Sequence, residues 1–422
     1  MDLGRGWRQA LADLPVWRRN QYVTVATVFV VFTGFAFVIP FLPLYVRALG
    51  VSDDGAVALW SGVLIGVTPL CAGVLAPVWG RLADRTGHKP MVLRALLAYV
   101  VLMLLSAAVT SAGQLLALRV LVGVFGGIGP LGLAMATALA PREQTGHAVG
   151  LVQSAQILSA AVGPFAGGVL ADLIGIRATF VVTALACLGA LLLVVRFYDE
   201  TPREDAPGAP AREAGRPALD AFLDVLRLPY VPVLLLTLLV VNFIGRSFTP
   251  ILPLHLQALG APAGRLALLT GVLISVYSVA AALSASAFGR ATRRHPPRSL
   301  LLASLVGGAA TVAPMAAAPN VPSFFALAVL LGLASGGALT LCYTLGGLIV
   351  PERVRTTAFG FFSAAALFGG AVSPSVAGLL AHLDLRGIFW LDTCLFVLLA
   401  AVLAPALRGA GAAVETSRPA AA

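Results

Sequence analysis

The stretch from Gly80 to Pro90, GRLADRTGHKP, places one carboxylate among several cations in a short segment between two long apolar runs. The residues whose types and spacing stand out are Gly80, Asp84, Arg85, Gly87 and Lys89. A carboxylate such as Asp84 can pair with a cation or with the N-terminus of a helix. Gly80 permits close approach of a neighbouring helix, and Gly87 permits a tight turn. A basic loop alone explains Arg85 and Lys89 but not this spacing.

A second candidate is Arg119 in the apolar segment LALRVLVGVFGG, where Gly123 and Gly127 follow at intervals of four. A charge at the centre of a membrane helix costs about 2.5–3.5 kcal/mol on insertion scales. We therefore expect Arg119 to face a polar cavity. The alternative is that its long side chain reaches the nearby outer surface.

The segment from Gly150 to Gly168, GLVQSAQILSAAVGPFAGG, combines small residues with a proline in another apolar run. The positions that form the pattern are Gly150, Gly163, Pro164, Gly167 and Gly168. Small residues let helix backbones approach closely, and proline bends a helix. Ordinary packing of two membrane helices is the alternative explanation.

Several polar and aromatic side chains interrupt the apolar runs and can line a path for a substrate. These candidates are Gln153, Gln156, Asn242, Arg246, Tyr277 and Tyr343. A mixture of amides and aromatic rings suits bulky amphiphiles held by few fixed hydrogen bonds. Interhelical packing is the alternative for each tyrosine.

Other chemistry is absent from the sequence. Lys89 is the single lysine, and no G-x-x-x-x-G-K-[ST] motif exists to bind ATP. The four cysteines, Cys71, Cys187, Cys342 and Cys394, lack the spacing of metal ligands, so we interpret them as small apolar fillers. We expect no enzyme, no metal and no cofactor, with an ion gradient as the energy source. Asp392 is the one carboxylate well inside an apolar run.

The elements that hold these residues are membrane helices. The chain is 59% hydrophobic and 11% charged, with a mean hydropathy of +0.95, whereas soluble domains are about a quarter charged. Runs near the roughly 20 residues that cross a bilayer predict an all-α polytopic membrane protein. The predicted spans are 21–46, 57–79, 91–111, 115–139, 148–171, 178–196, 230–254, 265–289, 299–318, 322–349, 357–381 and 387–407.

The net charge of +10 reflects topology and not a nucleic-acid partner. Most Lys and Arg fall in the segments between spans that lie on the same side of the membrane. Arg119 and Arg246 are the two that we place deep in spans. This asymmetry predicts that both termini are cytoplasmic. The ranges outside the spans are an amphipathic N-terminus (1–20), a proline-rich flexible linker (197–229) and a disordered C-terminal tail (408–422).

The chain repeats itself at an offset of 210 residues. IPFLPLYVRALG, starting at Ile39, matches TPILPLHLQALG, starting at Thr249, at seven of twelve positions. The sequence therefore predicts two homologous six-helix halves, 21–196 and 230–407. Because six is even, the two halves enter the membrane in the same orientation.

These motifs resemble those of the major facilitator superfamily over residues 20–407. The Gly80 segment is similar to its loop 2–3 signature, with His88 where arginine is usual, and the second copy has Arg293 at the position of Asp84. The resemblance implies a major facilitator fold of twelve helices and a latch role for Asp84. It also implies a proton-coupling role for Arg119 and an antiporter motif in span 5, where Ser159 replaces one glycine.

Within that family the chain looks most similar to bacterial twelve-span drug:proton antiporters of the MdtG and tetracycline-efflux type. We therefore expect a monomeric transporter in the cell membrane that exports small molecules by alternating access, in exchange for protons. An uptake symporter for a sugar or organic acid is the same-class alternative, and an intramembrane enzyme or receptor is the third. Because Arg119 and Arg246 lack an obvious acidic partner, we expect neutral or anionic substrates.

Overall fold

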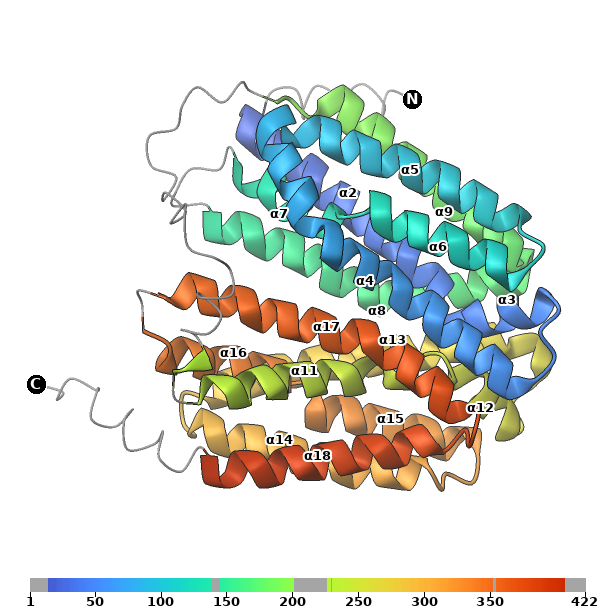
Figure 1. The fold of residues 1–422 in the computed structure, drawn as a ribbon, viewed down its shortest axis with the longest axis vertical. Coiled ribbons are helices and arrows are strands. Elements are labelled where there is room, and N and C mark those ends of the chain that lie inside the picture. Colours follow the sequence, from blue (N-terminus) through green and yellow to red (C-terminus); the bar gives the residue numbers. More distant parts are fainter. Residues whose placement is uncertain (1–13, 139–144, 201–225, 229, 352–353, 407–422) are drawn as a thin grey trace, which may run out of the picture. The chain divides into compact units, whose positions relative to one another are not determined.

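In a computed structural model, the structure describes residues 14–138, 145–200, 226–228, 230–351 and 354–406. Within those ranges the regular elements are all helices (Figure 1). The first half holds α2 (Val16–Val38), η1 (Ile39–Phe41), α3 (Leu42–Ala48), α4 (Asp54–Thr86), α5 (His88–Ala108), α6 (Ala112–Phe125), α7 (Ile128–Ala138), α8 (Thr145–Ile174) and α9 (Ile176–Phe197). The second half holds α11 (Val231–Ser247), α12 (Leu252–Ala258), η3 (Ala263–Arg265), α13 (Leu266–Ala291), α14 (Pro297–Met315), α15 (Val321–Ser335), α16 (Ala338–Ile349), α17 (Arg355–Ala381) and α18 (Gly387–Ala406).

Ten spans in the described part of the chain are long and apolar enough to cross a membrane, and the pair α11 and α12, bent by 50°, makes an eleventh. The remaining predicted span, 115–139, is not the continuous helix that we expected. It is divided into α6 and α7 at Gly126 and Gly127. Gly127 has a φ of +105°, a left-handed conformation that interrupts the helical hydrogen bonds.

The repeated segments form equivalent broken helix ends. Pro40 lies in η1 after α2, and Pro250 lies in the bend after α11, because proline lacks the N–H that would continue the helix. Each short helix that follows then ends at a glycine with positive φ, Gly50 at +97° and Gly260 at +88°. The internal repeat is therefore present in the backbone as well as in the sequence.

The chain divides into two compact units that do not coincide with its two sequence halves. Unit 1 consists of Met1–Ser52, Val67–Glu204 and Ala263–Ser275. Unit 2 consists of Asp53–Gly66, Asp205–Pro262 and Val276–Ala422. The first turns of α4 thus belong with the second half, and the first turns of α13 belong with the first half.

Unit 1 is organised around α2, which lies against α8 and α9, while α5 lies against α9 (Figure 1). Gly163 and Gly167 on α8 meet the backbone and small side chains of α2 at Ala36 and Phe37. On another side of α8, Gly168 meets the first turns of α13, where a Cβ would lie 2.6 Å from the Ala267 carbonyl oxygen. The Phe165 N–H also donates to the Ser275 hydroxyl over 3.0 Å.

Unit 2 repeats this arrangement, but glycine and serine change places at the equivalent positions of its helix pair. Its α11 lies against α17, and α14 lies against α15 and α18 (Figure 1). Gly369 on α17 meets the α11 backbone at Leu239, and the buried Ser373 donates to the Phe243 carbonyl. Gly62 and Gly378 pack α17 against the first turns of α4. The equivalent helices α8 and α17 therefore both contact their neighbours through glycine or serine.

The structure predicts that Gly163→Leu damages packing far more than Gly150→Leu on the same helix. A Cβ at Gly163 would overlap Ala36, whereas the space beside Gly150 is open. Overpacking a tight contact costs about 1–3 kcal/mol, so we expect that loss in the free energy of unfolding for Gly163→Leu. Thermal unfolding in detergent measures it, with Gly150→Leu as the control. Equal losses in both variants would show that close approach of α8 and α2 is not what the glycine provides.

Candidate functional site

Gly87 separates α4 from α5 at the loop 2–3 signature. Its φ of +95° and ψ of 161° lie in a region that is essentially restricted to glycine, so the chain turns here at a residue that a side chain would strain. Arg85 is exposed. The surroundings of Gly80 and of the Asp84 side chain lie outside what the structure describes, so the latch role stays a prediction.

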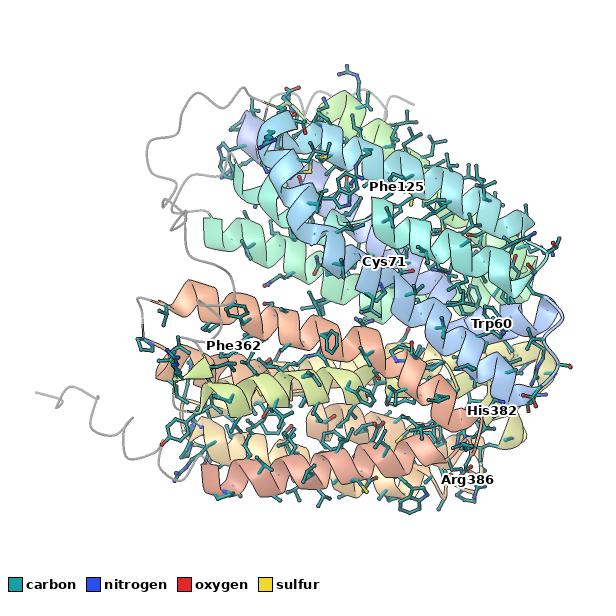
Figure 2. The ribbon with its side chains drawn as sticks, viewed as in Figure 1. Trp60, Cys71, Phe125, Phe362, His382 and Arg386 are labelled. Carbon is teal, nitrogen blue, oxygen red and sulfur yellow. The ribbon has the colours of Figure 1, made fainter. Side chains whose placement is uncertain are left out.

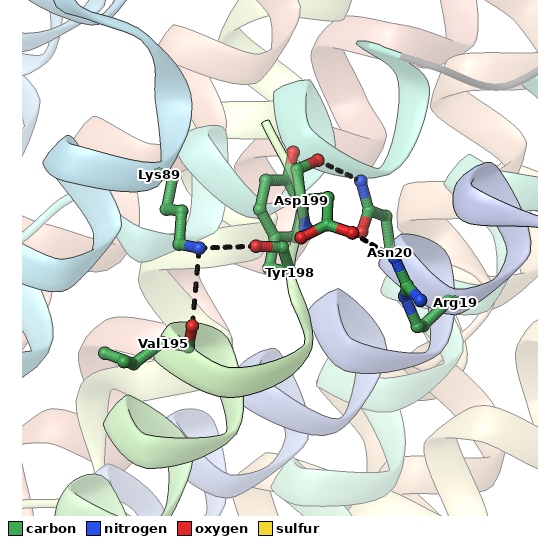
Figure 3. Close-up of polar contacts among 6 residues, drawn as sticks. All are labelled: Arg19, Asn20, Lys89, Val195, Tyr198 and Asp199. Carbon is green, nitrogen blue, oxygen red and sulfur yellow. Dashed lines mark hydrogen bonds and ion pairs between the residues drawn. The ribbon is translucent and has the colours of Figure 1, made fainter. Parts of the chain in front are cut away.

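The start of α5 is held by the segment that follows α9. The Glu200 carboxylate accepts hydrogen bonds from the backbone N–H groups of His88 and, over 3.3 Å, of Lys89. The Lys89 Nζ in turn donates to the carbonyl oxygens of Tyr198 at 2.5 Å and Val195 at 3.4 Å (Figure 3). A carboxylate at a helix N-terminus is stabilised by the unpaired N–H groups and the helix dipole.

The same segment is tied to the start of α2. Arg19 forms an ion pair with Asp199. The Asn20 side chain donates to the Asp199 carbonyl over 2.6 Å and accepts from its N–H over 3.0 Å (Figure 3). We call residues 198–200, with their bonds to α2 and α5, the clasp.

The clasp occupies the first residues of the predicted linker, 197–229. Its residues are ordered by the bonds just described, while 201–225 lie outside the described ranges. Burial raises the pKa of the Tyr198 phenol, and the neighbouring Glu200 raises it further. The phenol of this clasp residue therefore stays neutral. The acidic pair Asp199 and Glu200 in FYDE was the available signal, but the sequence does not show that their partners are Asn20 and His88.

Arg119 is 3% exposed, so the alternative in which it reaches the outer surface is wrong. Its guanidinium lies 5.9 Å from the centre of the Phe180 ring, and its buried Nε and Nη2 have no hydrogen-bond partner within the described ranges. The Thr68 hydroxyl donates to the Arg119 carbonyl over 3.0 Å and ties α6 to α4. A buried guanidinium with spare donors is able to bind an acceptor that enters unit 1.

Arg94 is a further intramembrane arginine that the sequence analysis did not single out. Its guanidinium lies 3.5 Å from the centre of the Trp79 ring, and its three buried nitrogens have no hydrogen-bond partner in the part of the chain that the structure describes. Trp79 is itself fixed, because its Nε1 donates to the Val124 carbonyl over 2.7 Å. The available signal was the position of Arg94 inside the predicted span 91–111.

The candidate glutamines of unit 1 lie on α8. Gln153 is exposed and Gln156 is half-buried, with its amide beside Gly129 of α7. One turn further along, Ser159 is buried and hydrogen bonds to Thr33 of α2 over 3.0 Å, so it is a packing residue. Neither glutamine side chain has a hydrogen-bond partner among the residues that the structure describes, so both are able to contact a ligand.

The candidate residues of unit 2 begin with Asn242 and Arg246, one turn apart on α11. The Asn242 amide donates to the Leu238 carbonyl over 3.0 Å. Arg246 is exposed, and its aliphatic part lies against Gly370 of α17. It has no hydrogen-bond or ion-pair partner among the residues that the structure describes.

Aromatic rings accompany these two residues in unit 2. Tyr343 lies 5.8 Å from the Phe359 ring and 6.4 Å from the Phe362 ring. Phe362 is labelled in Figure 2. Tyr277 meets Phe248 edge to face at 5.7 Å. Such rings provide flat apolar surfaces with a phenol at the edge, which suits amphiphilic ligands.

Asp392 on α18 is fully buried and hydrogen bonded to the Ser247 hydroxyl of α11. Its Oδ1 has no partner, and no ion pair joins it to Arg246 in the described part of the chain. The same hydroxyl lies 2.9 Å from the Ile244 carbonyl. Because a hydroxyl has one hydrogen, it donates to only one of these acceptors at a time.

The family model of the Major Facilitator Superfamily matches residues 24–272 and 266–421 of this chain. The chain belongs to this family. It is 33% identical over 393 residues to multidrug resistance protein MdtG of Enterobacter lignolyticus (strain SCF1), covering 93% of each chain. It is 31% identical to the protein of the same name in Proteus mirabilis (strain HI4320), over 89% of this chain and 92% of that one.

Solved structures agree on the fold. A bacterial homologue of the human lysosomal transporter Spinster, inward-facing and unoccupied, has a TM-score of 0.77 at 18% identity, over 93% of this chain and 97% of the other. A D-xylose–proton symporter has a TM-score of 0.67 at 16% identity, over 91% and 96%. The family and the apolar helices make this chain a multi-pass membrane transporter with the major facilitator fold.

The clasp predicts that Glu200→Ala exposes the first turn of α5. Losing an acceptor at a helix N-terminus costs about 1 kcal/mol, so the backbone amides of His88 and Lys89 should exchange roughly fivefold faster. Hydrogen–deuterium exchange of that peptide measures the effect. Glu200→Gln, which keeps an oxygen acceptor, is the control and should change exchange less. Unchanged exchange in Glu200→Ala would rule out the carboxylate as the cap of α5.

Proposed function

We propose that this chain exports small molecules from the cell in exchange for protons, by alternating access in the plasma membrane. The observation that carries the proposal is the likeness to proteins named multidrug resistance protein MdtG over about nine-tenths of both chains. The span 5 motif supports export over uptake, because in the family that it resembles this pattern of Gly150, Gly163, Pro164, Gly167 and Gly168 marks exporters.

The remaining parts of the proposal follow from the sequence. Both termini lie in the cytoplasm, as the basic segments indicate. The transporter works as a monomer without a cofactor, and the proton gradient drives export. Asp84 acts as a latch of one access state.

Everted membrane vesicles test the direction and the coupling. With the vesicle interior acidified, the unmodified protein should accumulate a fluorescent substrate, and a protonophore should abolish this uptake. Asp84→Asn should insert normally, because we predict a cytoplasmic position where one charge contributes little stability, yet transport more slowly by about tenfold or more. Accumulation by intact cells instead of everted vesicles would indicate an uptake symporter.

Asp392 is the proton site that we propose. Its carboxyl can donate to Ser247, which then donates to Ile244; once ionised, it accepts the Ser247 hydrogen instead. Asp392→Asn preserves the shape and should uncouple export, so that uptake into everted vesicles no longer responds to the pH gradient. Facilitated movement of the substrate down its own concentration gradient should persist. A normal response to the pH gradient would assign proton transfer to another residue.

Arg246 is the residue that we propose to set the sign of substrate charge. It is a cation on α11 without a described partner, and the buried Arg119 adds a second positive charge to the transporter. Without a compensating acid, an arginine favours anionic or acceptor-rich ligands. Arg246→Gln should reduce export of an anionic dye such as fluorescein and leave a neutral compound unchanged, with Arg293→Gln as the surface control. Robust export of the cation ethidium by the unmodified protein would contradict this assignment.

A further inference from the structure

A groove of about 440 Å³ lies at the end of unit 1 that carries the clasp. It is lined by side chains from α2, from the last three turns of α9 and from the clasp. These residues are Arg19, Gly189, Leu192, Leu193, Arg196, Phe197 and Asp199. None of them belongs to the transport residues described above.

One end of the groove is cationic. Arg196 is exposed and, among the residues that the structure describes, has no hydrogen-bond or ion-pair partner; its guanidinium lies 5.3 Å from the Phe197 ring. Arg19 shares its charge with Asp199, but its Nε is buried without a partner. Two guanidinium groups face one carboxylate, so the groove has a surplus positive charge and spare N–H donors.

The other end of the groove is apolar and continues along α9. Leu185, Leu188, Leu192 and Val195 are 60%, 38%, 58% and 50% exposed, at helical spacing on one face. Beside them, Gly189 leaves a notch, because no atom lies within 4 Å of the position where its Cβ would be. On a membrane span, an exposed aliphatic face of this kind contacts acyl chains.

Residues at the start of α2 indicate the depth of the groove in the membrane. Trp17 is half-buried, Arg18 next to it is exposed, and the guanidinium lies 5.1 Å from the indole ring. Tryptophan and arginine at the end of a span are typical of the headgroup region. The arginines of the groove are therefore at the depth of phosphates, and its leucines are at the depth of hydrocarbon.

We propose that this groove binds a membrane phospholipid with an anionic headgroup. The headgroup phosphate accepts hydrogen bonds from the exposed Arg196 guanidinium, with Arg19 adding positive charge nearby, and one acyl chain lies along α9 across the Gly189 notch. A zwitterionic lipid carries an ammonium group that the surplus positive charge disfavours. A soluble phosphate ester would make the arginine contacts but gain nothing from the aliphatic face.

Native mass spectrometry of the delipidated full chain tests this site with dioleoylphosphatidylglycerol, dioleoylphosphatidylcholine and glycerol phosphate. We expect tighter binding of the anionic lipid than of the zwitterionic lipid. Because one arginine near the surface is worth about 1 kcal/mol, Arg196→Gln should weaken binding of the anionic lipid roughly fivefold. Arg293→Gln removes the same charge from an exposed position in unit 2 and should leave binding unchanged.

Gly189→Leu fills the notch without altering charge and should weaken binding of both lipids. Arg196 and Gly189 are exposed, so neither substitution removes a packed side chain. Equal affinity for the two lipids, or equal losses from Arg196→Gln and Arg293→Gln, would overturn the proposal. Displacement of the bound lipid by glycerol phosphate at matched concentration would instead assign the groove to a free anion.

Discussion

The architecture depends on backbone contact between helices at glycine and serine. In a bilayer, lipid chains are as apolar as leucine, so helices gain little by merely burying apolar side chains against each other. What remains is van der Waals packing at close range, and that requires small residues. Close contact of this kind occurs at equivalent helix pairs, at Gly163 against Ala36 in unit 1 and at Gly369 against Leu239 in unit 2. When the repeats are aligned, these two glycines are one helical turn apart.

Much of this fold could be predicted because membrane helices have a strong hydropathy signal and because matching segments reveal the two homologous halves. The helix breaks were harder to foresee. The prolines near Ile39 and Thr249 mark bends, but hydropathy is insensitive to Gly126 and Gly127, which divide the predicted span 115–139. A glycine pair is compatible with either a straight or a broken helix, so the sequence leaves the positive φ of Gly127 undecided.

The candidate site was predictable by residue type but not by environment. Arg119 was identified because a charge in an apolar run is conspicuous, yet only the structure shows that it is buried beside Phe180. Arg94 was overlooked because it lies close to a basic loop, and its stacking on Trp79 joins residues from separate helices. The clasp depends on bonds spanning more than 100 positions, such as Glu200 to His88, and such pairings leave no local pattern.

The exchange of helix ends between the sequence halves has a consequence for biosynthesis. Unit 1 includes Ala263–Ser275, which the ribosome makes only after all the spans of the first half and the first span of the second. Until α13 enters the membrane, Gly168 on α8 lacks its neighbour, and a surface of small residues and backbone faces lipid or the insertion machinery. The first six helices therefore cannot complete their packing during their own synthesis. A nascent chain that stalls before residue 263 would leave a half-formed unit as a substrate for membrane quality control.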